Sequence, residues 1–265
     1  MRRSIALAAS ALLSVTMVGA PVSMPLAGAI VHAPRIVITR DKGGHGHGGG
    51  GGGGGSSFDW ASSNWSGYAV SGGTYTSITG SWTVPTVQPT VGSTYSSSWI
   101  GIDGFNNSSL IQAGTEQDYV NGKAVYAAWW EILPAPETAI PSITVHPGDT
   151  IKASITRGTT GTWAITISDG GQSFTTNQSY GGPLSSAEWI QEAPSIGGHV
   201  ATLAHYGEAT FDPGTANGAG PNLTVTDGGV MIQHRTQVST PSVPDSDSDG
   251  FNIAYGPTQP AVPAS

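Results

Sequence analysis

The sequence has no cysteine and little charge of either sign. Among its 265 residues there is no Cys, and this absence excludes disulfide bonds, thiolate metal sites and cysteine nucleophiles. Charged residues make up only 10% of the chain, against about 25% in an average soluble protein. We therefore expect a fold that is stabilised by its hydrophobic core and that has a surface rich in hydroxyl groups.

Basic residues are especially scarce beyond the N-terminal region. Of the 9 Lys and Arg residues only Lys123, Lys152, Arg157 and Arg235 follow residue 57, whereas Asp41 is the only one of the 17 acidic residues that precedes it. Residues 58–265 therefore carry a charge of −12 when their histidines are neutral. This negative charge argues against nucleic acid or an anionic membrane as a partner.

The only long apolar run lies at the N-terminus. It follows the basic residues of MRRS and ends in small residues up to Ala29, a composition typical of a secretory signal peptide. Because the run is short and is interrupted by Ser10, Ser14 and Gly19, it does not read as a membrane-spanning helix. We expect residues 1–29 to be a signal peptide and the mature protein to be secreted into the extracellular space, with no membrane partner.

Residues 30–57 differ in composition from the rest of the chain. They combine the basic sequence VHAPRIVITRDK with a glycine run that ends at Gly55. Such a composition is typical of a pro-segment joined to a domain by a flexible tether.

From residue 58 to residue 257, short segments of alternating β-branched or aromatic residues recur between turn sequences such as HPGDT and SDGGQ. About a dozen strands without a long amphipathic helix predict an all-β fold, an antiparallel sandwich or jelly roll. We expect one domain over residues 58–257, a monomer, and a flexible tail over residues 258–265.

The sequence gives little support for a serine triad, a histidine metal site or a calcium loop. A serine triad needs a histidine close to a serine on a sharp turn. The sequence has no G-x-S-x-G motif that would provide such a serine. His199 and His205 could form half of a metal site, but no third ligand is evident. The sequence DSDSDG at 245–250 begins like a calcium loop, yet Gly256 stands where the bidentate Glu would be, so we expect a turn between the last two strands. We expect no metal and no cofactor.

Two polar residues stand in otherwise apolar predicted strands. In AEWIQEA, alternation places Glu188 on one face with Ile190, and in SLIQAG it places Gln112 on one face with Leu110. A buried carboxylate without a partner costs several kcal/mol, so such residues either pair with each other or a loop backbone, or line a cleft. The pattern alone leaves both interpretations open.

Six motifs in order resemble those of the glutamic peptidases, or eqolisins. They are NWSGYAV at 64–70, GSWTVP at 80–85, SWIGIDG at 98–104, LIQAGTE at 110–116, YAAWWEILP at 126–134 and AEWIQE at 187–192. The resemblance implies a secreted, acid-acting endopeptidase on a two-sheet, concanavalin-like β-sandwich, with Gln112 and Glu188 as its catalytic dyad. It also implies substrate contacts for Trp99, Asp103, Trp129 and Glu131. Ala127 and Leu133 depart from the best-known fungal members, which have an acid and an aromatic residue there.

The chemistry of a Gln and Glu dyad suits peptide hydrolysis. Glu188 as general base would take a proton from water, and the Gln112 amide would stabilise the oxyanion. The basic residues 30–57 suggest a further hypothesis, in which they cover an anionic cleft near neutral pH and dissociate when its carboxylates protonate. The alternative function is a carbohydrate-binding or adhesive β-sandwich, because exposed Trp and Tyr side chains would suit sugar stacking.

Overall fold

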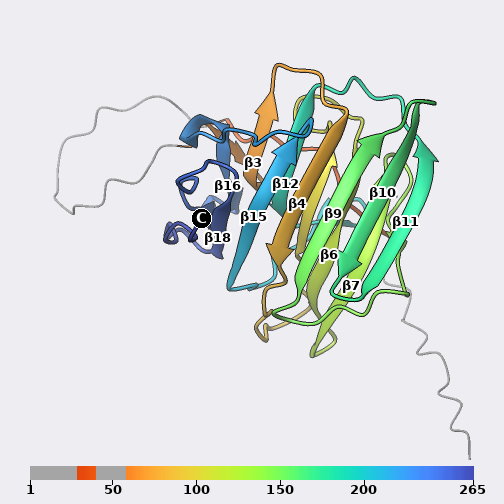
Figure 1. Cartoon of the computed structure of the whole chain (residues 1–265). Coiled ribbons are helices and arrows are strands. Elements are labelled where there is room, and N and C mark those ends of the chain that lie inside the picture. Colours follow the sequence, from red (N-terminus) through yellow and green to blue (C-terminus); the bar gives the residue numbers. More distant parts are fainter. Residues whose placement is uncertain (1–28, 40–57) are drawn as a thin grey trace, which may run out of the picture.

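The computed structural model describes residues 29–39 and 58–265, and within these ranges the protein is built from β-strands (Figure 1). The expected signal peptide up to residue 28 and the glycine run at 40–57 lie outside the described residues. One 3₁₀ turn, η1 (Val225–Asp227), is present, and no helix in the described part of the chain is long and apolar enough to cross a membrane.

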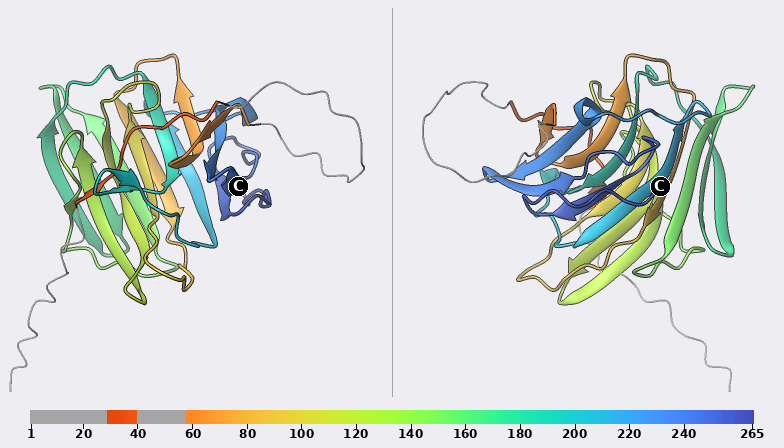
Figure 2. Two further views of the ribbon diagram at one scale, coloured as in Figure 1. Left: turned by 180° about the vertical axis from the view of Figure 1, so that it is seen from behind. Right: turned by 60° about the vertical axis from the view of Figure 1, so that its left-hand side comes forward.

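Fifteen of the described strands form one sheet, and fourteen of them lie on a continuous hydrogen-bonded path that curls into two layers (Figures 1 and 2). The first layer contains β11 (Gln172–Ser179), β10 (Thr162–Asp169), β9 (Thr150–Arg157), β4 (Ser77–Thr83) and β15 (Glu208–Ala216). The second contains β3 (Trp65–Ser71), β12 (Ser186–Glu192), β5 (Ser97–Ile102), β6 (Ile111–Val120), β7 (Lys123–Ile132) and β8 (Thr138–Ala139).

The two layers are joined by β18 (Phe251–Tyr255), β17 (Thr236–Pro241) and β16 (Gly228–Gln233), which lie between β15 and β3 on the path. The short strand β2 (Trp60–Ser62) pairs with β16 in parallel, whereas the other paired strands are antiparallel. A separate small sheet contains β1 (Ile30–Val31), β13 (Ser195–Ile196) and β14 (His199–Val200). The predicted all-β antiparallel sandwich is confirmed.

The core between the layers is formed by one face of each sheet. β4 and β9 pack on β5, and β9 and β10 pack on β6, so alternate residues of these strands meet in a single apolar cluster. Its largest members include Trp82, Trp163 and Trp189, each at most 2% exposed. Burial of aromatic side chains is a large stabilising contribution, in keeping with a domain that has no disulfide.

Turns predicted from the sequence lie where strands reverse. SDGGQ forms the tip between β10 and β11, with Gly170 at φ +52. The acidic sequence at 245–250 lies between β17 and β18, which pair antiparallel, as a turn between the last strands requires. Residues 258–265 contain no strand, although the Ala261 carbonyl accepts a hydrogen bond from Asn252 Nδ2 at 3.0 Å.

Candidate active site

The two polar residues singled out in the sequence lie in one row across the second layer. Glu188 on β12 is paired with Gly101 on β5, Gly101 with Gln112 on β6, and Gln112 with Glu131 on β7. Directly paired residues of an antiparallel sheet point to the same face. At a strand spacing of about 4.8 Å the Cα atoms of Glu188 and Gln112 are therefore about 10 Å apart. Gly101 between them has no side chain, and Trp99 and Leu110 pack over it.

Two further rows continue the same face away from the core. The next row contains Ile190, Trp99, Gly114 and Trp129, and the one after it contains Glu192, Ser97, Glu116 and Ala127. We call this surface the groove face. The intervening residues of each strand, among them Trp189, Ile100 and Ala113, point into the core instead. The strand alternation predicted for both motifs is thus confirmed.

Glu188 is fully buried on this face. Neither of its carboxylate oxygens, nor Oε1 of Gln112, has a hydrogen-bond partner within the described residues. Burial raises the pKa of Glu188 well above its ordinary value and the charge of Asp103 raises it further, while the neighbouring Ser186 hydroxyl and the positive charge of Arg35 lower it in part. Glu188 and Gln112 do not hydrogen-bond to each other, so the direct structural pair that the sequence allowed is not formed.

Residues 29–39 lie across the groove face (Figure 2, left, in red). Ile30 and Val31 pair with β13. Farther along, the Ala33 carbonyl accepts hydrogen bonds from Trp65 Nε1 at 3.0 Å and Asn64 Nδ2 at 3.2 Å, and Ile38 N donates to the Ala61 carbonyl at 2.9 Å. The segment therefore binds in an extended form with partners along most of its length.

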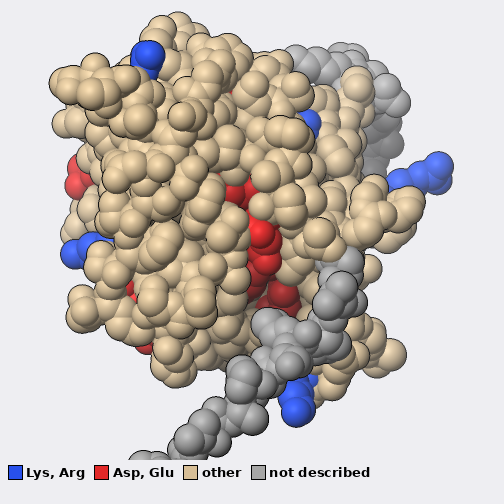
Figure 3. Space-filling model, turned by 90° about the vertical axis from the view of Figure 1, so that its right-hand side faces the viewer, with Lys and Arg blue, Asp and Glu red and all other residues tan. Residues whose placement is uncertain are grey.

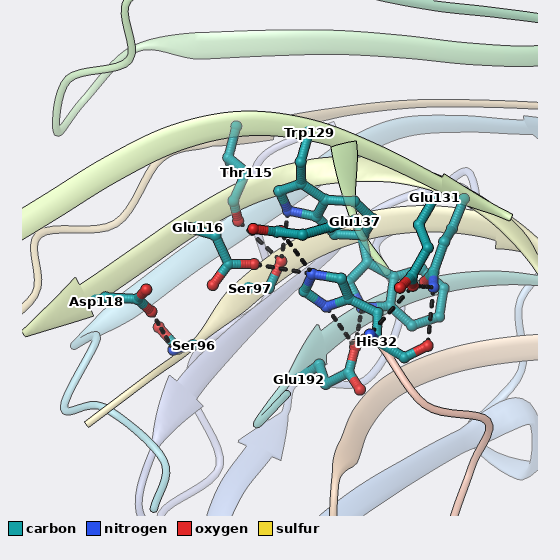
Figure 4. Close-up of polar contacts among 12 residues, drawn as sticks. His32, Ser96, Ser97, Thr115, Glu116, Asp118, Trp129, Glu131, Glu137 and Glu192 are labelled. Atoms are coloured by element: carbon teal, nitrogen blue, oxygen red, sulfur yellow. Dashed lines mark hydrogen bonds and ion pairs between the residues drawn. The ribbon is translucent and has the colours of Figure 1, made fainter. Parts of the chain in front are cut away.

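His32 is the one buried residue of this segment, and Figure 4 shows its polar contacts. Its ring stacks on Trp129, with a centroid distance of 3.6 Å and an interplanar angle of 3°. Its Nε2 lies 3.0 Å from Glu116 Oε1 and 3.2 Å from Glu137 Oε2, and its Nδ1 lies 3.1 Å from Glu192 Oε2. We call Trp129, Glu116, Glu137 and Glu192 the imidazole cage.

The main chain of His32 contacts the predicted catalytic row. Gln112 Nε2 donates to the His32 carbonyl oxygen at 2.9 Å and to Glu131 Oε2 at 2.6 Å. The His32 N–H also donates to Glu131 Oε2, at 3.1 Å. Gln112 is therefore held by Glu131 with its amide group directed at a peptide carbonyl.

The electrostatic character of the site is strongly acidic. Acidic side chains gather in a hollow near the centre of one face of the molecule, and the Lys and Arg side chains visible there lie toward the edges (Figure 3). Burial is the largest influence on Glu131, and together with repulsion from Glu192 it raises the pKa of Glu131 to about 8 despite the opposing effect of His32. Burial likewise raises the pKa values of Glu116 and Glu192.

The candidate substrate residues have different environments. Trp99 lies on the groove face and donates from Nε1 to Glu192 Oε2 at 2.8 Å, while Trp129 and Glu131 contact the segment directly. Asp103, in contrast, accepts hydrogen bonds from Leu184 N and Ser185 N at 2.8 Å and from Tyr180 at 2.6 Å. Its contacts tie a loop to the end of β5, so we assign it a positioning role.

Four groove residues escaped the sequence prediction. Glu116 and Glu192 lie four positions after Gln112 and Glu188 on the same strands, so the same alternation could have identified them. Asn64 and Glu137 stand at a turn before β3 and in a loop before β8, where no periodic pattern marks them.

Among residues 29–39 and 58–265, two groups of side chains have the proximity that a metal site needs. His32, Glu116 and Glu137 form one, and Asp212, Asp245 and Asp249 the other, each with ligand atoms within 4.8 Å of one another. The first group is accounted for by the contact between the segment and the groove. The second is an acidic cluster between the last turn and Asp212 of β15, and no further observation marks it as a metal site.

Gly114 determines how closely the two groove tryptophans approach. A methyl group added here would lie 2.5 Å from Trp99 Cβ, 2.6 Å from the Ser98 carbonyl and 2.8 Å from Trp129 Cζ2. We expect Gly114→Ala to reduce the free energy of unfolding by about 1–3 kcal/mol, as overpacking does. Thermal unfolding followed by circular dichroism tests this. Gly220→Ala, whose methyl group would meet nothing within 4 Å, should unfold like the parent, and equal stability of both variants would contradict the tight contact.

Comparison with known proteins assigns the chain to a family. The model of the Peptidase A4 family matches residues 63–255. The chain belongs to the peptidase A4 family. Aspergillopepsin-2 from Aspergillus niger is 30% identical over 220 residues, which cover 71% of this chain and 76% of the relative. The family is that of the glutamic peptidases, or eqolisins, and the protein is a glutamic endopeptidase of this acid protease family.

Solved structures of this family share the fold. Scytalido-glutamic peptidase with a transition-state analog inhibitor matches with a TM-score of 0.62 and 21% identity, over 73% of this chain and 98% of that one. SCP-B, an eqolisin in complex with the tripeptide Ala-Ile-His, matches with a TM-score of 0.58 and 21% identity over the same shares. Aspergilloglutamic peptidase from Aspergillus niger matches with a TM-score of 0.51 and 26% identity, over 61% and 99%. The eqolisin β-sandwich is thus confirmed.

The alternative of a sugar-binding sandwich is not supported. Stacking on sugars needs aromatic rings that are open to solvent, but seven of the eight tryptophans are buried and Trp130 is half-buried.

Proposed function

We propose that Glu188 and Gln112 are the catalytic dyad of this endopeptidase. The observation that carries the proposal is their shared row on the groove face, separated by Gly101, with both Glu188 oxygens and Gln112 Oε1 free of hydrogen-bond partners within the described residues. Two long side chains about 10 Å apart at their Cα atoms can both reach one water molecule or one carbonyl group between them.

The residues would act in different steps. Ionised Glu188 takes a proton from the attacking water and later passes it to the leaving amine. Gln112 donates from Nε2 to the carbonyl oxygen as negative charge develops there. Because an amide does not titrate, this donor persists at low pH. Glu131 holds Gln112 in place through the hydrogen bond of 2.6 Å.

Peptides are the proposed substrates, bound in extended form along the groove face. Solved eqolisins hold a peptide-based transition-state analog and a tripeptide, and here a segment of the chain itself occupies the face. Trp129 and Glu131 touch this segment and are the strongest candidates for substrate contacts, with Trp99 behind them.

We also propose secretion and latency. The composition of residues 1–29 supports export, and the mature enzyme would then act outside the cell. Residues 30–57 would be a pro-segment, because their described part, up to residue 39, covers Gln112 and shields the groove. While the segment is bound it occupies the groove face, so no other peptide can reach Glu188 and Gln112 and the precursor is inactive toward added protein.

The opened enzyme should digest denatured casein best below about pH 5. Once the segment leaves, water returns to Glu188 and its pKa falls toward the ordinary value of about 4.3, so the base becomes ionised in mild acid. At neutral pH the groove carboxylates ionise together and repel the oxyanion. Rates of the processed and unprocessed proteins between pH 2 and 8 test this, and a maximum near neutrality, or equal rates for both forms throughout, would contradict it.

A further inference from the structure

The structure holds one peptide bond of the chain in the position of a substrate. The His32 carbonyl accepts the Gln112 amide at 2.9 Å, which is the contact that the proposed mechanism requires of a scissile carbonyl. On the acyl side, Ile30 and Val31 form β1, which is held by its pairing with β13. On the amine side, Trp65 and Asn64 hold the Ala33 carbonyl. The bond between His32 and Ala33 is therefore anchored from both directions.

The imidazole cage explains why His32, and not a neighbouring residue of the segment, occupies this position on the groove face. His32 is 0% exposed, lies flat on Trp129 and has a carboxylate within 3.2 Å of each ring nitrogen. Such charge-assisted contacts favour a cationic ring over a neutral side chain of similar size. The neighbouring side chains of Val31 and Ala33 have no comparable polar partners, so His32 sets the alignment of the segment.

Arg35 provides a second anchor beside the catalytic base. Its guanidinium carbon lies 3.7 Å from the centroid of the Phe105 ring, and it donates from Nε to the Phe105 carbonyl at 3.0 Å and from Nη2 to Asn106 at 3.0 Å. Its charge lowers the pKa of Glu188 against the larger effect of burial. Arg35 therefore helps Glu188 to ionise while the segment is bound.

The directions of the pKa values in the closed form argue against release of the segment by acid alone. Burial would lower the pKa of His32, but Glu116, Glu137 and Glu192 outweigh it and raise that pKa well above the ordinary value. The pKa values of Glu116, Glu131, Glu188 and Glu192 are raised as well. A group whose pKa is raised in the closed form stabilises that form fully at pH values below its ordinary pKa. This stabilisation is lost as the pH rises through the raised pKa. The hypothesis from the sequence, in which protonation of the carboxylates releases the segment, requires the opposite dependence of binding on pH.

We propose that the bond between His32 and Ala33 is the one that this peptidase cuts to open its own groove, and that the imidazole cage selects a cationic histidine on the acyl side of the bond to be cut. The inference rests on the proposed dyad. It names the processing site and a substrate preference, neither of which follows from membership of the family.

The reaction consumes one water molecule. Ionised Glu188 accepts a proton from this water as the water oxygen bonds to the His32 carbonyl carbon, and Gln112 stabilises the resulting oxyanion. The bond from that carbon to the Ala33 nitrogen then breaks, and Glu188 returns the proton to the nitrogen. The products are a carboxyl group on His32 and an amine on Ala33. Residues 33–57 stay covalently attached to the domain, while the part up to His32 can leave.

The processing site is tested on the full chain, purified and then incubated at pH values from about 4 to about 7, a range over which the ionised fraction of Glu188 in the closed form rises. Intact mass and N-terminal sequencing are followed over time beside casein digestion. We expect a new N-terminus at Ala33 that appears together with activity. Activity that develops while the N-terminus lies elsewhere would overturn the inference and leave the dyad standing. Absence of casein digestion at every stage would instead overturn the proposed function, and the inference with it.

The preference is tested with the peptide AIVHAPRIVIT, which corresponds to residues 29–39, and with a form that carries Gln in place of its histidine. For the processed enzyme we expect kcat/KM at the fourth bond to fall at least about tenfold with Gln, the size expected for lost charge-assisted contacts. Glu137→Gln, at a half-buried position that should not affect folding, should reduce this preference, whereas exposed Glu208→Gln should retain it. Equal rates for both peptides would overturn the assigned selectivity.

Discussion

Glu188→Gln is expected to reduce casein digestion at about pH 4 by at least about 1,000-fold. A positioned general base contributes about 100- to 10,000-fold, and here the same carboxylate also returns the proton to the leaving amine, so its loss affects both halves of the reaction. Glutamine keeps the size and polarity of the side chain, and the fully buried site on β12 should therefore retain its packing. The measurement is kcat/KM on a chromogenic peptide with the opened enzyme.

Opening must not depend on the residue that is tested. A recognition sequence for a site-specific protease, inserted in the glycine run that ends at Gly55, lets the leader be cut from parent and variant alike, and gel filtration above about pH 8, where the closed form is least stable, then removes it from the groove face. Exposed Glu208→Gln, on β15 away from the groove, is the matched control and should keep full activity. If Glu188→Gln digests casein at more than about a tenth of the parent rate, Glu188 is not the base.

Gln112→Ala is expected to lower kcat by about 100- to 1,000-fold, the cost of removing one oxyanion-hole donor. KM should change little, because the transition state gains more from this donor than the bound peptide does. The pH at which the opened enzyme is half-maximally active on its acidic limb should stay in place, because Glu188 still sets it. Steady-state kinetics from pH 2 to 6 measure both quantities.

Two outcomes separate a catalytic from a structural role for Gln112. The exposed Gln88→Ala variant should behave like the parent, and thermal unfolding of Gln112→Ala should show that the fold persists. A variant that loses activity only through a higher KM would show that Gln112 binds the peptide without stabilising the oxyanion.

The fold and the dyad could be predicted from sequence because both depend on alternation. Period-two patterns in β6 and β12 assign Gln112 and Glu188 to the side opposite Ala113 and Trp189, and one buried face fixes the register of such strands. The row through Gly101 depends on strand pairing, which the alternation within a single strand does not specify. Here the resemblance between the ordered motifs supplied the missing information.

The role of His32 could not be predicted in this way. Its partners come from β6, β7, β12 and the loop before β8, and its sequence separation from Glu192 is 160 residues. Only the basic character of the leader indicated an acidic binding surface. The charge of the leader predicts that it is attracted to an acidic surface. It does not predict whether lower pH strengthens or weakens the binding, because that depends on which pKa values burial raises in the bound form.

The same register has a practical consequence at Ala127. It pairs with Glu116 at the open end of the third row and is half-buried, whereas its neighbour Ala128 is only 1% exposed. Residue 127 can thus be exchanged for larger or charged amino acids without disturbing the interior. Libraries that vary residue 127 alone can therefore be used to change the cleavage preference while the dyad residues are kept.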